Sequence, residues 1–143
     1  MVKYRKWSHT TYDCRYHLVW ITKYRRPCLT EKIQKRLEIL LKWICKWLFV
    51  KILSIWMEED HVHMYISIPL SLAIPKAVQR LKWWSSNQLR KEFSNELKEW
   101  YWRKKLWADW YFIATVWEIN HETIKNYVDM QGKEENKFEE IDL

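Results

Sequence analysis

Glycine is almost absent from this chain of 143 residues, which contains Gly132 alone and only three prolines. Average usage of about 7% would give roughly 10 glycines, so most turns have to form without the residue that takes a positive φ at no steric cost. Long hydrophobic runs are also missing: none approaches the roughly 18 residues of a membrane span, and residues 1–13 lack the apolar core of a signal peptide. These absences predict a soluble, cytoplasmic protein.

Cysteine is too scarce for a disulfide framework. The three cysteines, Cys14, Cys28 and Cys45, are odd in number and form no C-x-x-C pair, which also argues against a zinc knuckle. A content of 48% hydrophobic and 30% charged residues excludes a fibrous or disordered chain and suits one globular domain. We expect that domain to cover residues 1–132 and to be followed by a flexible acidic tail, 133–143.

Positive charge is concentrated in the first third of the chain. Residues 1–51 hold 13 Lys and Arg against 3 acidic residues, a balance of +10, whereas residues 52–143 hold 12 against 15, a balance of −3. Cationic side chains that meet phosphates release condensed counterions, so this distribution favours a nucleic acid as partner. A basic surface that serves only solubility is the alternative.

The hydrophobic pattern predicts a split β-α-β arrangement. Runs of β-branched and aromatic residues predict strands, and apolar positions three and four apart predict helices. The second and third strands are expected to form a hairpin. Residues 94–107 follow no clear period. The expected strands are 16–22, 50–56, 62–68 and 111–116, and the expected helices are 30–48, 74–93 and 122–131. This order predicts an α+β, ferredoxin-like or RRM-like fold: an antiparallel sheet of four to five strands with helices on one face and a C-terminal helix bearing Tyr127. Such a fold fixes no function.

The segment His61-Val62-His63 is the first candidate site. Residues two apart on a strand project from the same face, so both imidazoles can converge on one metal ion while Val62 enters the core. The neighbouring Asp60 can orient one of the rings, or it can simply be part of an acidic corner. Histidine pairs at this spacing are also common in purely structural positions, so the pair by itself does not define a metal site.

Tyr127 and Gln131 are the second candidate, because they lie one turn apart on a predicted helix and therefore share a side of it. A phenol can attack phosphorus to form a phosphotyrosine, and an amide oxygen one turn later can complete a metal shell. A tyrosine packed in the core is the alternative interpretation.

Five segments, in this order, resemble the small single-domain tyrosine transposases of the IS200/IS605 group, which belong to the HUH endonuclease superfamily. They are YHLVWITKYRRP (16–27), EEDHVHMYISIP (58–69), RLKWWSSNQLRKEF (80–93), LWADWYFIATV (106–116) and ETIKNYVDMQ (122–131). The resemblance covers the chain from about His9 to Gly132.

The resemblance implies a set of roles for the candidate residues. His61 and His63 match the histidines of the HUH motif and would bind Mg²⁺ or Mn²⁺; Gln131 matches a third ligand and Tyr127 the nucleophile. The implied reaction cleaves and rejoins single-stranded DNA at insertion-sequence ends through a 5′-phosphotyrosine. Members of the family act as homodimers on DNA hairpins.

Basic residues around two of the matching segments are candidates for DNA contacts. Arg25, Arg26, Lys82 and Arg90 would contact phosphates, and Tyr24 would stack on a base. Solvated surface positions are the alternative for each of them. Two rival functions also remain: a non-catalytic module that binds single-stranded nucleic acid, and an inactive or domesticated relative that acts on repeat hairpins.

Several of the 12 tryptophans occupy positions where the family typically carries glycine, among them Trp83, Trp84 and Trp117. Trp20 and Trp107, by contrast, fit the family. The other 10 tryptophans plus Gly132 make 11 candidate glycines, close to the roughly 10 expected. One hypothesis is that glycine codons have been read as tryptophan; a decayed copy and true divergence are the alternatives. If the indoles are genuine, Trp83, Trp84 and Trp117 are expected to crowd the turns before the basic helix and the tyrosine helix.

Overall fold

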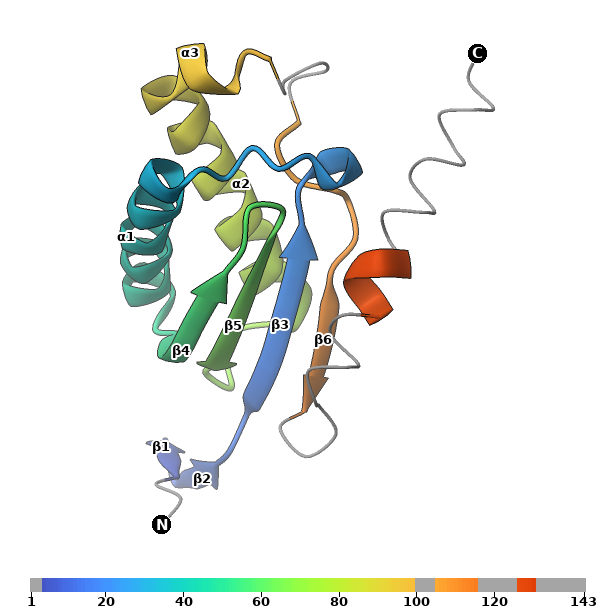
Figure 1. The fold of residues 1–143 in the computed structure, drawn as a ribbon. Helices are drawn as coiled ribbons and strands as arrows, with labels where there is room; N and C mark the ends of the chain where they lie inside the picture. Colours follow the sequence, from blue (N-terminus) through green and yellow to red (C-terminus); the bar gives the residue numbers. More distant parts are fainter. Residues whose placement is uncertain (1–3, 100–104, 116–125, 131–143) are drawn as a thin grey trace.

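The computed structural model describes residues 4–99, 105–115 and 126–130, and its centre is an antiparallel sheet of four strands in the order β4-β5-β3-β6 (Figure 1). The strands of this sheet are β3 (Arg15–Ile21), β4 (Lys51–Met57), β5 (His61–Ser67) and β6 (Phe112–Thr115). The helices are η1 (Lys23–Arg25), α1 (Glu31–Leu48), α2 (Ile74–Glu92) and α3 (Ser94–Leu97), with a helical segment at 126–130. The predicted α+β fold is confirmed, with four strands in the main sheet.

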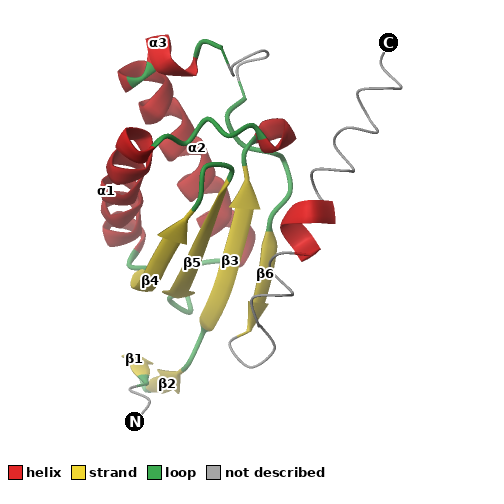
Figure 2. Ribbon diagram, viewed as in Figure 1, coloured by secondary structure: helices red, strands yellow, loops and turns green. Residues whose placement is uncertain are grey.

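Helices α1 and α2 cover one face of the sheet, and segment 126–130 lies beside β6 (Figures 1 and 2). Alternate residues of the central strands, such as Leu18, Trp20 and Met64, are fully buried beneath these two helices. The Trp20 ring meets Trp107 edge to face at 5.7 Å, and the indole N–H of Trp107 donates to Ser85 at 3.1 Å. Both tryptophans that fit the family are therefore core residues.

Local sequence accounts for the ends of α1. Thr30 is the predicted N-cap, and its side chain accepts a hydrogen bond from the Ile33 N–H at 3.4 Å. The helix ends at Phe49, which adopts a left-handed φ of 57° where glycine is the usual residue. Four other described non-glycine residues have a positive φ: Ser8, His9, Tyr24 and Arg25.

The expected crowding of a turn by Trp83 and Trp84 is wrong. Both residues lie inside α2, where the helical backbone has a negative φ, and Trp83 projects into solvent with 59% of its surface exposed. No described tryptophan has a positive φ. Trp117 lies outside the described residues.

Two features were not predicted from the sequence. A short hairpin, β1 (Arg5–Trp7) with β2 (Thr10–Tyr12), precedes the sheet, and Arg5 ties it to the carbonyls of Ser67 at 3.0 Å and Phe49 at 2.9 Å. The unassigned stretch after α2 contains the single turn α3.

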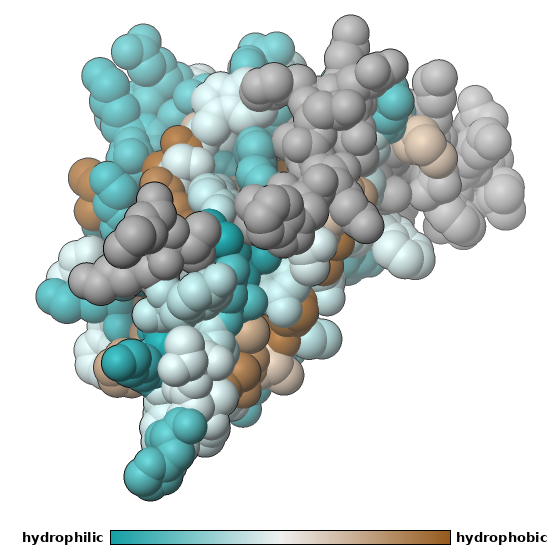
Figure 3. Space-filling view, turned by 90° about the horizontal axis from the view of Figure 1, so that it is seen from below, coloured by the Kyte–Doolittle hydropathy of each residue, from teal (hydrophilic) through white to brown (hydrophobic). Residues whose placement is uncertain are grey.

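The three cysteines are free, and two of them lie in the core. Cys28 and Cys45 are buried, and burial raises their pKa values to about 11 and about 12. Viewed from below, apolar side chains reach the surface among hydrophilic ones (Figure 3). Within the described parts, no helix is long and apolar enough to cross a bilayer. The predicted tail, 133–143, and the boundary before it lie outside the described residues.

Candidate metal and nucleophile site

The sheet face opposite α1 and α2 carries both histidines of the H-x-H segment. Strand register places His61 opposite Ile21 and His63 opposite Val19, while Val62 is fully buried on the helical side, as predicted. One row of directly paired residues crosses all four strands of the sheet: Trp56, His63, Val19 and Phe112. Paired side chains share a face, so this row forms the floor of the candidate site.

Asp60 holds the His61 ring. Its carboxylate lies 2.8 Å from His61 Nδ1 and also accepts a hydrogen bond from Arg25 Nε at 3.2 Å. The bond to His61, followed by the nearby positive charge of Arg25, keeps the pKa of Asp60 below its ordinary value. With Nδ1 directed at the carboxylate, Nε2 is the His61 nitrogen suited to a metal ion.

His63 has a neighbour that the sequence did not single out. His17 lies on β3, and its Nδ1 is 2.9 Å from His63 Nε2. Burial lowers the pKa of His17, which favours a neutral ring. The Trp56 ring stands edge to face against both His61, at 5.6 Å, and His63, at 5.7 Å.

Tyr127 lies on the same face of the sheet as the histidines. Its ring contacts Phe112, at the end of the cross-strand row, with 5.2 Å between ring centroids. Beside it, Val128 is buried together with Val19 and Ile21. The Tyr127 hydroxyl is shielded from solvent.

Arg25 connects the two halves of this face. Besides Asp60, its guanidinium pairs with Asp129 at 3.0 Å, on the helical turn that carries Tyr127. Arg25, which the sequence predicts to contact a phosphate, therefore also links the H-x-H corner to segment 126–130. Sequence spacing gave no signal of this, because Arg25 and Asp129 are 104 residues apart.

The two described imidazoles are donors of the kind that a divalent metal ion takes. Two imidazoles held on one face suit a divalent cation with open positions for phosphate and water. Among residues 4–99, 105–115 and 126–130, no group of three or more His, Cys, Asp or Glu side chains could hold a metal ion by itself. The predicted third ligand, Gln131, is an amide and lies outside the described residues.

The remaining predicted DNA contacts fall into two places. Tyr24 lies in η1, and both Lys23 and Arg26 stack their cationic groups over its ring, at 4.8 and 5.1 Å. Lys82 and Arg90 both line a hollow of about 370 Å³ between α2 and the segment before β6. Lys82 also donates to the carbonyl oxygens of Ala108 and Trp110, which gives it a structural part.

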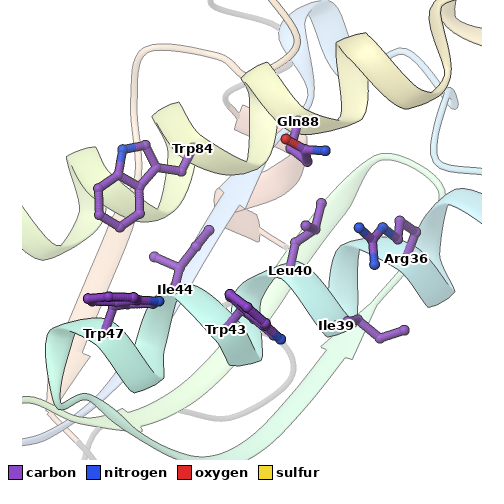
Figure 4. A pocket seen from close by; sticks show the side chains of 8 residues that line it. All are labelled: Arg36, Ile39, Leu40, Trp43, Ile44, Trp47, Trp84 and Gln88. Atoms are coloured by element: carbon purple, nitrogen blue, oxygen red, sulfur yellow. The ribbon is translucent and has the colours of Figure 1, made fainter.

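An apolar groove lies on the helical side of the molecule, away from the histidines. It measures about 610 Å³ and is lined mainly by side chains of α1, with Trp43 and Trp47 facing Trp84 of α2 (Figure 4). None of the predicted site residues lines it.

Comparisons with known proteins place this geometry in context. The family model described as "Transposase IS200 like" matches residues 10–131. The chain is 30% identical over 136 residues to the transposase for insertion sequence element IS200 of Salmonella typhimurium, covering 95% of this chain and 88% of the relative. It is 32% identical over 124 residues to the ISDra2 transposase TnpA of Deinococcus radiodurans, covering 87% and 88%.

Solved structures agree with the fold. A crystal structure of a candidate transposase from Deinococcus radiodurans R1 superposes with a TM-score of 0.82 at 28% identity, covering 89% of this chain and 97% of that one. A REP-associated tyrosine transposase bound to a REP hairpin superposes with a TM-score of 0.55 at 14% identity, covering 90% and 69%. The second likeness supports the fold alone.

Proposed function

Because this chain belongs to the family of IS200-like transposases, we propose that it cleaves and rejoins single-stranded DNA, with Tyr127 as nucleophile and a divalent metal held by His61, His63 and Gln131. One observation carries the proposal: the two imidazoles and the Tyr127 segment occupy the same face of the sheet, joined by the row His63, Val19 and Phe112. The substrate would be the hairpin-bearing ends of an insertion sequence, and the working form a homodimer.

The chemistry assigned to Tyr127 is a transesterification. The phenol oxygen attacks the scissile phosphorus, the bond to the 3′-oxygen breaks, and a 5′-phosphotyrosine and a free 3′-hydroxyl result. The phenol loses one proton and the departing oxygen takes one up, so the step consumes no water. A later attack by a 3′-hydroxyl on the phosphotyrosine restores the phenol and joins the strands.

Each described residue of the site has a part in this proposal. His61, oriented by Asp60, and His63 hold the cation; Mg²⁺ or Mn²⁺, when bound, neutralises charge that develops on the phosphate oxygens. Arg25, Arg26, Lys82 and Arg90 attract the DNA backbone, and Tyr24 offers a ring on which a base can stack.

Segment 126–130 has to move for the reaction to occur. The Tyr127 hydroxyl is shielded from solvent in its contact with Phe112, so a phosphate cannot approach it there. Breaking the partly exposed ion pair between Arg25 and Asp129 is a modest step, because ion pairs near the surface contribute about 0–1 kcal/mol. A DNA phosphate that engages Arg25 would therefore favour release of the segment.

The first prediction concerns covalent attachment. A 3′-labelled single-stranded oligonucleotide that carries an element end should form an SDS-stable adduct with the protein in Mn²⁺, because the tyrosine retains the 5′-phosphate of the downstream fragment. Tyr127→Phe should abolish the adduct and still shift the hairpin in a native gel. Tyr4→Phe, which removes an exposed phenol outside the site, is the matched control and should leave the adduct unchanged.

Two results would contradict the proposal. An adduct that persists in Tyr127→Phe would assign the nucleophile elsewhere. Hairpin binding by the unaltered protein, with no adduct in Mn²⁺ or Mg²⁺, would instead support a non-catalytic binding module or an inactive copy.

A further inference from the structure

We propose that His17 is a positioning residue for the metal ligand His63, an inference that rests on the proposed function. The observation is the contact between His17 Nδ1 and His63 Nε2, 2.9 Å apart, across neighbouring strands. At this distance one ring nitrogen donates its proton and the other accepts it, so the tautomers of the two imidazoles are coupled. The bond also fixes the tilt of the His63 ring.

The arrangement parallels that of the other histidine. His61 is held by Asp60 at 2.8 Å, and His63 is held by His17 at 2.9 Å. A histidine that binds metal through one ring nitrogen commonly has its other nitrogen held by a carboxylate, a carbonyl or another polar group, which sets the tautomer and the ring orientation. Each ligand of the H-x-H pair thus has its own orienting partner, one local in sequence and one distant.

His17 is itself held rigidly enough to act in this way. Its ring stacks on Tyr65 with 4.8 Å between centroids and an angle of 13° between the planes. The Tyr65 hydroxyl accepts a hydrogen bond from Arg15 at 2.9 Å, and Arg15 is anchored by two bonds to Asp13, at 2.6 and 2.9 Å. A continuous chain of contacts therefore joins the start of β3 to the metal ligand.

His17 acts through His63 and is not itself a ligand. Its ring stacks on Tyr65, which Arg15 contacts in turn, and in the described residues no group of three or more His, Cys, Asp or Glu forms a metal-binding cluster. The expected effect of losing His17 is therefore a weakened metal site, with the ligands and the nucleophile intact.

The second prediction tests this with Mn²⁺ alone. His17→Phe keeps a ring for stacking on Tyr65 and removes both nitrogens, so Mn²⁺ affinity, measured from the EPR signal of free Mn²⁺, should fall about 10-fold or more. His17→Asn, whose amide can reach the place of Nδ1, should recover part of that loss. His9→Phe changes an exposed turn histidine and is the matched control, with unchanged affinity.

Nitrogen-15 NMR of the histidine rings gives a second readout, with Mg²⁺ as a diamagnetic probe. His17→Phe should alter the ratio of His63 tautomers and leave that of His61 unchanged. Unaltered Mn²⁺ affinity and unaltered His63 tautomers in His17→Phe would overturn the inference, as would a metal-induced shift showing that His17 binds the ion directly. Failure of the unaltered protein to bind Mn²⁺ would instead count against the proposed function.

Discussion

Asp60 is the residue on which the charges of the candidate site converge. One carboxylate oxygen is bonded to His61 and the other to Arg25, at 2.8 and 3.2 Å. Both partners favour the ionised form, His61 most strongly, and together they lower the pKa of Asp60. The sequence indicates Asp60 as a possible partner of a histidine ring, and the structure shows that it holds the ring of His61.

The third prediction follows from that lowered pKa. Asp60→Asn should decrease the free energy of unfolding by about 1–3 kcal/mol at pH 7, because two bonded groups lose a charged acceptor. A carboxyl whose pKa is lowered by folding stabilises the fold at pH values above its unfolded pKa, here 3.8. This stabilisation is lost as the pH falls through the pKa of the folded state. The difference in the free energy of unfolding between Asp60→Asn and the unaltered protein should therefore persist down to about pH 4 and shrink below it.

Urea unfolding at a series of pH values measures this difference. Asp109→Asn is the matched control: the pKa of Asp109 is also lowered, chiefly by its bond to Lys105, but that pair is well exposed, so its loss should cost less. A difference for Asp60→Asn that grows toward low pH would contradict the assignment.

At the scale of elements, three kinds of contact among the described residues join segment 126–130 to the rest of the domain. Val128 is buried against Val19 and Ile21, Tyr127 packs on Phe112, and Asp129 pairs with Arg25. The Arg25 backbone is left-handed, at a φ of 52°, as is that of Tyr24, so the turn after β3 holds the guanidinium in place. Because an ion pair near the surface contributes little, breaking the pair between Arg25 and Asp129 would let the segment undock without unfolding the domain.

The fourth prediction concerns this docking. Arg25→Gln should speed amide hydrogen exchange several-fold in the peptide that contains Tyr127, because the link to Asp129 is lost, while exchange in α1 and α2 stays unchanged. Hydrogen exchange with mass spectrometry measures both. Arg36→Gln is the control: it breaks a two-bond pair with Glu92, at 2.8 Å for each bond, and should not affect the Tyr127 peptide. Equal exchange in Arg25→Gln and the unaltered protein would show that packing alone holds the segment.

At the scale of the whole molecule, the tryptophans divide by burial. Trp20 and Trp107 form part of the core, whereas six others are exposed. The exposed indoles are Trp7, Trp43, Trp47, Trp56, Trp83 and Trp110. The core therefore does not use the indoles of these six, and the reading of glycine codons as tryptophan stays a hypothesis. The groove in Figure 4 exists largely because Trp43 and Trp47 line it.

The fifth prediction uses that division. Each of the single variants Trp43→Gly, Trp47→Gly and Trp83→Gly should keep the fold and lower self-association. Each should cost about 1 kcal/mol of stability, because the new glycine lies inside a helix. Trp20→Gly should cost at least about 3–5 kcal/mol, because it empties a fully buried site. Thermal unfolding by circular dichroism and sedimentation velocity measure the two effects. A single variant at 43, 47 or 83 that unfolds as readily as Trp20→Gly would show that the exposed indole at that position is structural.

The sequence by itself determined the order of the elements and the identity of the H-x-H pair. Strand and helix periods in 16–22, 30–48 and 62–68 are local properties, so they could be recognised without coordinates, as could the Thr30 cap. The N-terminal hairpin escaped prediction because its three-residue strands carry too short a pattern. The roles of Tyr127 and Gln131 stay predictions.

Only the tertiary structure decided which residues meet around the site. His17 and His63 are 46 residues apart, and Arg25 and Asp129 are 104 apart; strand register joins the first pair and the docking of segment 126–130 the second. A one-residue change of register would send His17 to the opposite face of the sheet. Burial sorted the tryptophans in the same way, because exposure depends on which helix face meets the sheet, and no local pattern of indoles contains that information.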